Sequence, residues 1–252
     1  MKDYKKVIAE RYDKQTYDGK GIKENMYSLI NPTGFYGEFQ SAKVLYEFVN
    51  MLAVRNKSWD MIKVCDCGCG GGNKTRLMAE LLGNPNQVYG IEYSKNRLQS
   101  CKSMNNYIHY EFADITVPGK GIPFEIQFDG VTAFVVFMHF SKEKDIISAL
   151  QNIYDSLKKR GLFLWYEANA DSHREGRAKD IDGWGFASKE MDKYASKVGF
   201  RLIRQYGVYT QIPVINTATV YLAKDIKNMD ILGLLERLPF KKNNNVRIYC
   251  KE

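Results

Sequence analysis

Val64-Cys-Asp-Cys-Gly-Cys-Gly-Gly-Gly72 is the stretch that decides the fold, because it joins a predicted buried strand to a predicted helix through a glycine-rich turn. Glycines at 68, 70 and 72 permit positive φ angles and let a ligand lie against bare backbone. The following helix offers free N–H groups to a polar ligand. Dinucleotides, nucleotide phosphates and S-adenosylmethionine all bind at such turns. The dinucleotide pattern needs glycine where Asn73 stands, and the phosphate-loop pattern needs glycine directly before Lys74.

Outward from this turn, apolar strand patterns alternate with helical ones. Strands are predicted at 61–66, 87–92, 108–114, 128–137 and 161–167. Helices are predicted after the glycine turn through 77–82, at 96–103, through 146–157 and at 188–198. Alternation of this kind predicts a mostly parallel sheet with helices on both faces. Two later strands, 200–206 and 217–224, are predicted to form an antiparallel pair at one edge. The fold class is therefore α/β, a Rossmann-like sheet of seven strands.

Three shorter patterns complete this outline. Residues 1–60 are predicted to be a helical N-terminal extension or lid, with 61–252 as the main domain, because residues 44–52 have apolar side chains at helical spacing. Lys158-Lys-Arg-Gly161 is predicted to cap the preceding helix with cations at its negative end. Lys241–Asn245 is predicted to be a hairpin turn.

Composition limits the class of protein. The chain has 252 residues and a net charge of +8, so its surface attracts anions in general. Cationic and acidic residues are mixed along its length, and no basic arm that would bind nucleic acid stands out. We find no membrane-spanning stretch and no secretory signal, and we expect a cytoplasmic protein. Cys65, Cys67 and Cys69 have no second cysteine pair with which to converge, so no metal site is predicted and they are interpreted as small apolar fillers.

The motifs at successive strand ends resemble those of class I S-adenosylmethionine-dependent methyltransferases, over roughly residues 61–223. The resemblance implies S-adenosylmethionine as cofactor, with Gly68 and Gly70 against it and Asp66 near its amino group. It implies that Glu92 accepts hydrogen bonds from the ribose hydroxyls and that Asp114 contacts the adenine amino group. Three further residues are expected to contact the cofactor: Tyr93, Ile115 and Phe134.

The acceptor side is less defined. His139, just past the fourth predicted strand, is the candidate catalytic base, because histidine titrates near neutrality; a structural role at a helix entry is the alternative. The polar stretch after the fifth strand is long and rich in ionisable groups, which is typical of functional loops. Predicted acceptor-binding residues in and near this stretch and in the N-terminal extension are Tyr17, Tyr36, Glu167, His173, Arg174 and Trp184.

We therefore expect a methyltransferase, and the leading hypothesis is O-methylation of a small polar acceptor such as a sugar or a phosphorylated metabolite. The loop at 168–184 loosely resembles that of bacterial enzymes that methylate sugars in polysaccharide biosynthesis. N-methylation of a small amine and methylation of RNA are the alternatives. RNA is favoured by the charge but not by any recognisable RNA-binding module. The sequence leaves the acceptor and the oligomeric state open.

Overall fold

The structure is a computed structural model that describes residues 5–8, 10, 32–56, 58–168, 188–210, 234, 237–239 and 242–252. The strands are β1 (Val64–Cys67), β2 (Val88–Glu92), β3 (His109–Phe112), β4 (Phe128–Phe134), β5 (Leu157–Ala168), β6 (Phe200–Thr210) and β7 (Lys242–Lys251). The α-helices are α2 (Pro32–Arg55), α3 (Asn73–Leu82), α4 (Lys95–Met104), α5 (Glu143–Ser156) and α6 (Ser188–Val198). Short 3₁₀ helices are η1 (Trp59–Met61), η2 (Pro85–Gln87) and η3 (Phe137–His139).

The strands form one seven-stranded sheet in the order β3-β2-β1-β4-β5-β7-β6. Strands β1 to β5 pair in parallel, whereas β7 runs antiparallel to both of its neighbours, β5 and β6. The predicted Rossmann-like, mostly parallel sheet is confirmed, and its antiparallel strand is β7, next to the β6 edge. Because β1 to β5 are parallel, their carboxyl ends meet at one edge of the sheet, where open α/β sheets bind ligands.

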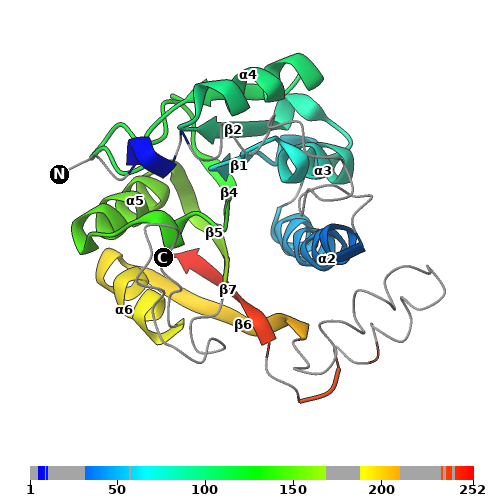
Figure 1. Cartoon of the computed structure of the whole chain (residues 1–252), viewed down its shortest axis with the longest axis vertical. Coiled ribbons are helices and arrows are strands. Elements are labelled where there is room, and N and C mark those ends of the chain that lie inside the picture. Colours follow the sequence, from blue (N-terminus) through cyan, green and yellow to red (C-terminus); the bar gives the residue numbers. More distant parts are fainter. Residues whose placement is uncertain are drawn as a thin grey trace.

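Helices cover both faces of the sheet, with α2 and α3 on one side and α5 and α6 on the other (Figure 1). Two hydrophobic clusters fill the spaces between these layers. The apolar stripe predicted on α2 is buried in the first cluster, and its members are Val44, Leu45, Phe48, Val49 and Leu52. Strands β1 and β4 are buried along nearly their whole length, which explains their continuous apolar sequences.

Local sequence explains where the helices begin and end. Glycines in the left-handed conformation flank α3 on both sides, at Gly72 and Gly83. The N-cap of α4 is Ser94, whose hydroxyl accepts a hydrogen bond from the backbone N–H of Arg97 at 3.2 Å. These signals place α3 directly after the glycine turn and α4 directly after β2, so both helices begin at the carboxyl edge of the sheet.

The predicted helix cap at Lys158–Gly161 is wrong. Helix α5 ends at Ser156, and β5 already begins at Leu157, which pairs with Phe128 before an irregularity in the β4–β5 register. The cation that caps α5 comes from the far end of the chain, because Lys251 Nζ donates to two carbonyls at the helix end, each at 2.7 Å. The β4–β5 register skips Lys158 to Arg160, and Arg160 has a φ of 65°, so these residues form an irregular segment within β5 and not a helix cap.

The predicted hairpin turn at Lys241–Asn245 is also wrong, because β7 begins at Lys242 and pairs along its length with β5 and β6. Its asparagines are accommodated inside the sheet: Asn245 is buried, and Asn244 donates to the Tyr166 hydroxyl at 2.8 Å. Tertiary pairing therefore overrides the turn preference of asparagine. The strand predicted at 217–224 lies outside the described residues.

The structure also shows the environment of the cysteines and the character of the helices. All five cysteines are buried and carry free thiols, in agreement with their interpretation as apolar fillers. Among the described residues, no group of three His, Cys, Asp or Glu side chains could hold a metal ion. Within the same part of the chain, no helix combines the length and the apolar character needed to cross a membrane.

Candidate functional site

The glycine turn, residues 68–72, lies between β1 and α3 at the carboxyl edge of the sheet. Gly68 and Gly70 have φ angles of 71° and 55°. The Gly68 N–H donates to the Ile91 carbonyl at 2.8 Å, which holds the turn against β2. A Cβ atom at Gly68 would lie 2.6 Å from Val136 Cγ2, so only glycine fits there. The turn therefore presents bare backbone at the place where the sequence predicted a cofactor.

Asp66 is buried in β1, just before this turn. Its two carboxylate oxygens accept hydrogen bonds from the hydroxyls of Thr75 at 2.7 Å and Thr132 at 2.8 Å. Burial raises the pKa of Asp66 to about 6, and the two hydrogen bonds limit the rise. These threonines are fully buried and were missed by the sequence analysis, because only the β1–β4 and β1–α3 packing brings them to Asp66.

Glu92 ends β2 and reaches back to the glycine turn. One carboxylate oxygen accepts from the Gly70 N–H and the other from the Ser94 N–H, each at 2.8 Å. A carboxylate has about four acceptor positions, so each oxygen retains capacity for another donor. The neighbouring residue Tyr93 stacks on Phe112, with ring centres 5.7 Å apart. The structure thus brings Glu92 and Gly70 together; that both contact the cofactor stays a prediction.

Asp114 follows β3, and Ile115 beside it is buried. Its carboxylate accepts from the backbone N–H and the hydroxyl of Thr116, at 2.9 and 2.7 Å. Lys5, from the N-terminal helical segment 5–8, forms an ion pair with it at 2.7 Å. Burial raises the pKa of Asp114, but the hydrogen bonds from Lys5 and Thr116 outweigh burial and leave the pKa below its ordinary value. The Lys5 contact was not predicted.

The post-β4 turn, residues 135–139, leads from β4 into η3 beside the glycine turn. Val135 has a φ angle of 56°, in the left-handed region that β-branched residues rarely adopt. Its N–H donates to the Tyr166 carbonyl at 2.8 Å, which ties the turn to β5. Just before it, Phe134 lies against Tyr166 with ring centres 5.0 Å apart. His139, the candidate base, is the last residue of η3 and is partly buried.

The other predicted acceptor-binding residues fall into two groups. Tyr36 on α2 and Glu167 at the end of β5 are described, and both are buried, with 2% and 0% of their surface exposed. Tyr17, His173, Arg174 and Trp184 lie outside the described residues.

An ion pair that the sequence analysis missed joins α2 to α3. Lys74, in the first turn of α3, pairs with Glu38 of α2. Its Nζ also lies 5.9 Å from the centre of the Phe134 ring, and its charge lowers the pKa of Asp66. Lys74 is the second residue after the glycine turn, and this position in the sequence could have indicated that it lies near the site. Its partner in α2 could not be read from the sequence.

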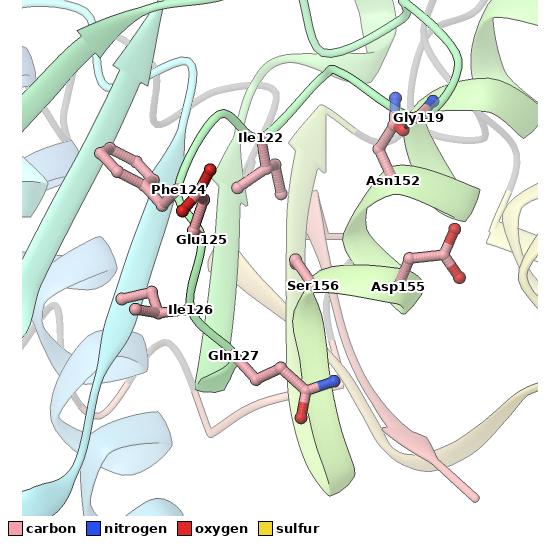
Figure 2. A pocket seen from close by; sticks show the side chains of 9 residues that line it. All are labelled: Gly119, Ile122, Phe124, Glu125, Ile126, Gln127, Asn152, Asp155 and Ser156. Carbon is pink, nitrogen blue, oxygen red and sulfur yellow. Dashed lines mark hydrogen bonds between the residues drawn. The ribbon is translucent and has the colours of Figure 1, made fainter.

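A surface cavity of about 410 Å³ lies at the other end of β4. The loop before β4 supplies one wall, including Ile122 and Phe124, and the last turns of α5 supply the other, including Asn152 and Asp155 (Figure 2). Asn152 supports that loop, because its side chain bonds to Ile115, Val117 and Gly119 backbone atoms. The cavity is at the amino end of β4, away from the glycine turn.

A model of a known protein family matches part of the chain. Residues 64–161 match a family model described as a methyltransferase domain. This segment contains the glycine turn, Glu92, Asp114 and the post-β4 turn. No curated protein matches the chain.

Solved structures share the fold over the whole chain. Magnesium protoporphyrin IX methyltransferase from Synechocystis PCC 6803, solved with bound S-adenosylmethionine, superposes with a TM-score of 0.64 at 12% identity, covering 100% of this chain and 99% of that one. A TehB-like S-adenosylmethionine-dependent methyltransferase from Corynebacterium glutamicum gives a TM-score of 0.54 at 15% identity, covering 99% and 98%. One from Mesorhizobium loti gives 0.54 at 14% identity, covering 80% and 96%. At such identities the likeness establishes the fold alone.

Proposed function

We propose that the chain is a class I S-adenosylmethionine-dependent methyltransferase, since residues 64–161 match a methyltransferase domain, and that it methylates a small polar acceptor at the carboxyl ends of β4 and β5. Its cofactor is S-adenosylmethionine. The observation that carries the proposed site is the pairing of Glu92 with the Gly70 N–H, because it sets a carboxylate with spare acceptor capacity beside bare backbone.

The residues at the first three strand ends fit the cofactor's chemistry. A ribose has two neighbouring hydroxyl donors, and the two oxygens of Glu92 have acceptor positions for both. Asp114 is the candidate acceptor for the adenine amino group, with Ile115 beside the ring. Asp66 is the candidate partner for the cofactor's amino group, and Tyr93 and Phe134 complete the proposed contacts. When bound, the cofactor supplies an electrophilic methyl group on a positively charged sulfur.

The proposed reaction needs alignment and one proton transfer. A lone pair of the acceptor oxygen forms the new bond to the methyl carbon while the carbon–sulfur bond breaks, and the bonding electrons stay on sulfur. The acceptor hydroxyl gives its proton to a base, for which His139 is our candidate. Orientation and exclusion of water supply much of the rate of such displacements. A sugar-like or phosphorylated acceptor, with a role in polysaccharide modification, remains our leading proposal.

We further propose that residues 1–60 act as a lid over this site. Two ion pairs support the proposal, because Lys5 reaches Asp114 and Glu38 reaches Lys74 next to the glycine turn. Five free cysteines support a reducing compartment, and we propose that the enzyme works in the cytoplasm on a small molecule rather than on nucleic acid.

The cofactor site is tested by calorimetric titration with S-adenosylhomocysteine. Glu92→Gln keeps the shape of the side chain but replaces one acceptor oxygen by an NH₂ group, so we expect affinity to fall about tenfold or more. Glu111→Gln, an exposed glutamate on β3, is the matched control and should bind normally. Unchanged affinity in Glu92→Gln, or binding of NAD in place of the nucleoside, would contradict the proposal.

The acceptor is tested with S-adenosylmethionine that carries a tritiated methyl group, incubated with fractionated small-molecule extracts. A methyl ether resists base and does not bind a cation exchanger, whereas an N-methyl amine is retained on it at acid pH. We expect label in the ether fraction, and loss of that label with retained cofactor binding in His139→Ala. Label confined to the retained fraction would establish N-methylation and reject the proposed O-methylation.

A further inference from the structure

The post-β4 turn has the backbone shape of an anion-binding site. Val135 is in the left-handed region and Val136 in the right-handed helical region, with φ −108° and ψ −47°. A left-handed residue followed by a right-handed one turns successive N–H groups toward the same side. Such concave arrangements of N–H groups, called nests, bind anions. The cradle here is formed by residues 136–138, at the carboxyl end of β4.

The carboxylate of Glu167 fills this cradle. One of its oxygens accepts from the Met138 N–H at 3.1 Å, and the N–H groups of Val136 and Phe137 bond to the same carboxylate. The other oxygen accepts from the Ala168 N–H at 3.3 Å. The residue is completely buried. Burial raises the pKa of Glu167 to about 8, and the backbone N–H groups oppose that rise, so the side chain is the anion above about pH 8. A buried carboxylate is tolerated when N–H donors replace its lost water.

The turn that Glu167 holds touches both parts of the candidate site. The Val136 side chain occupies the space above Gly68, where a Cβ would meet it at 2.6 Å. The backbone N–H of His139 donates to the Val136 carbonyl at 3.1 Å, which fixes the start of η3 to the same residue. The cradle, the wall over the glycine turn and the candidate base are therefore consecutive in one short segment.

We propose that Glu167 is a positioning residue for methyl transfer: its carboxylate is an internal anion that fixes residues 136–138, and through them the placement of Val136 over Gly68 and of His139. This role differs from the acceptor contact that the sequence suggested, because the carboxylate is turned into the protein. The proposal rests on the cofactor site proposed above.

The test uses chemical rescue of cofactor binding at about pH 9, where the wild-type Glu167 side chain is the anion. Glu167→Ala removes the anion and leaves the N–H cradle empty, so we expect the affinity for S-adenosylhomocysteine to fall about tenfold. Formate, a free carboxylate small enough for the vacated space, should restore most of that affinity at constant ionic strength. Formamide, its neutral counterpart of similar size, should not restore it. The wild-type protein should respond to neither.

A second variant and a spectroscopic readout keep the test decisive if Glu167→Ala folds poorly. Glu167→Gln keeps the volume and one acceptor oxygen, and should weaken binding about threefold with no response to formate. The chain has only three histidines, so their ring signals are readily assigned by NMR. The His139 signal should move in Glu167→Gln, and the signal of His109 on β3 should not.

Four results decide between the alternatives. Wild-type affinity in both Glu167 variants overturns the proposal. A loss of affinity in folded Glu167→Ala that formate and formamide leave equally unrepaired also overturns it, because a packing role explains that result. If Glu92→Gln loses affinity while the Glu167 variants do not, the cofactor site stands and only the positioning role fails. If Glu92→Gln binds normally, the cofactor site itself fails.

Discussion

The carboxyl edge of the sheet has two halves that use their acidic side chains in opposite ways. In the β2–β3 half, Glu92 and Asp114 are partly exposed, and each holds a few local donors. In the β4–β5 half, Glu167 is fully buried, and backbone N–H groups of its own chain bind it. Glu92 and Asp114 retain acceptor positions for a ligand, whereas the acceptor positions of Glu167 are taken by backbone N–H groups of the protein itself.

The difference indicates which acids are available to bind a ligand and which one stabilises the fold around the site. A carboxylate exchanges its partners for a ligand at lower cost near solvent, because a buried charge that loses its donors is very costly. A carboxylate that fixes a turn gains from burial, because its bonds cannot be replaced by water. Variants at the junction of the two halves should therefore have the largest effects, and variants at the exposed rim the smallest.

The largest effect is expected for Gly68→Ala, at the junction itself. The new Cβ would meet Val136 at 2.6 Å and would require a φ of 71°. We expect a loss of about 3 kcal/mol in the free energy of unfolding, measured with urea, together with loss of S-adenosylhomocysteine binding. Gly71→Ala is the control, because nothing lies within 4 Å of its Cβ position. Equal stability of the two variants would show that the halves are not in tight contact.

Asp66→Asn should change how stability depends on pH. Burial raises the pKa of Asp66 from 3.8 to about 6, so the folded protein holds this proton more tightly than the unfolded chain does. The resulting stability is complete below about pH 4 and is lost as the pH rises through 6. Relative to Asp66→Asn, the wild type should lose about 2 kcal/mol between pH 4 and pH 7 in urea titrations. Parallel curves for the two proteins would contradict the raised pKa.

Val135→Gly probes the strain stored in the β4–β5 half. Glycine accepts the φ of 56° without penalty, so we expect the free energy of unfolding to rise by about 1 kcal/mol or less. Arg160→Gly relieves a similar φ of 65° within β5 and is the matched comparison. Only Val135→Gly should also weaken S-adenosylhomocysteine binding, since only it loosens the turn over Gly68. Equal affinity for S-adenosylhomocysteine in both variants would show that the strained φ of Val135 has no influence on the cofactor site.

The smallest effect is expected at the rim, for the pair of Lys5 and Asp114. Both side chains are about one-fifth exposed, so their attraction is partly screened by water. A double-mutant cycle with Lys5→Met and Asp114→Asn, followed by urea unfolding, should give a coupling of about 0.5 kcal/mol that decreases in salt. A coupling above about 2 kcal/mol would place this pair with the buried acids and remove the contrast between the halves.

Much of the fold was predictable, because it depends on local pattern. The first five strands, their connecting helices and the parallel order followed from alternating apolar periodicity around the glycine turn. The two errors both concern pairing partners. Lys158 to Arg160 fall within β5 because Leu157 and Leu162, on either side of them, pair with β4. Asn244 and Asn245 belong to β7 because β5 and β6 pair with them. No local signal reports a neighbour that is distant in the sequence.

The candidate site divides in the same way. The sequence by itself determined the glycine turn and the acids Glu92 and Asp114, because bare backbone and strand-end carboxylates are properties of residue type and position. Only the tertiary structure decided what Glu167 and Val135 do. The role of the buried Glu167 depends on the backbone N–H groups that bind it, and the strained φ of Val135 depends on the hydrogen bond from its N–H to β5. The packing of β4 against β5 brings these groups together.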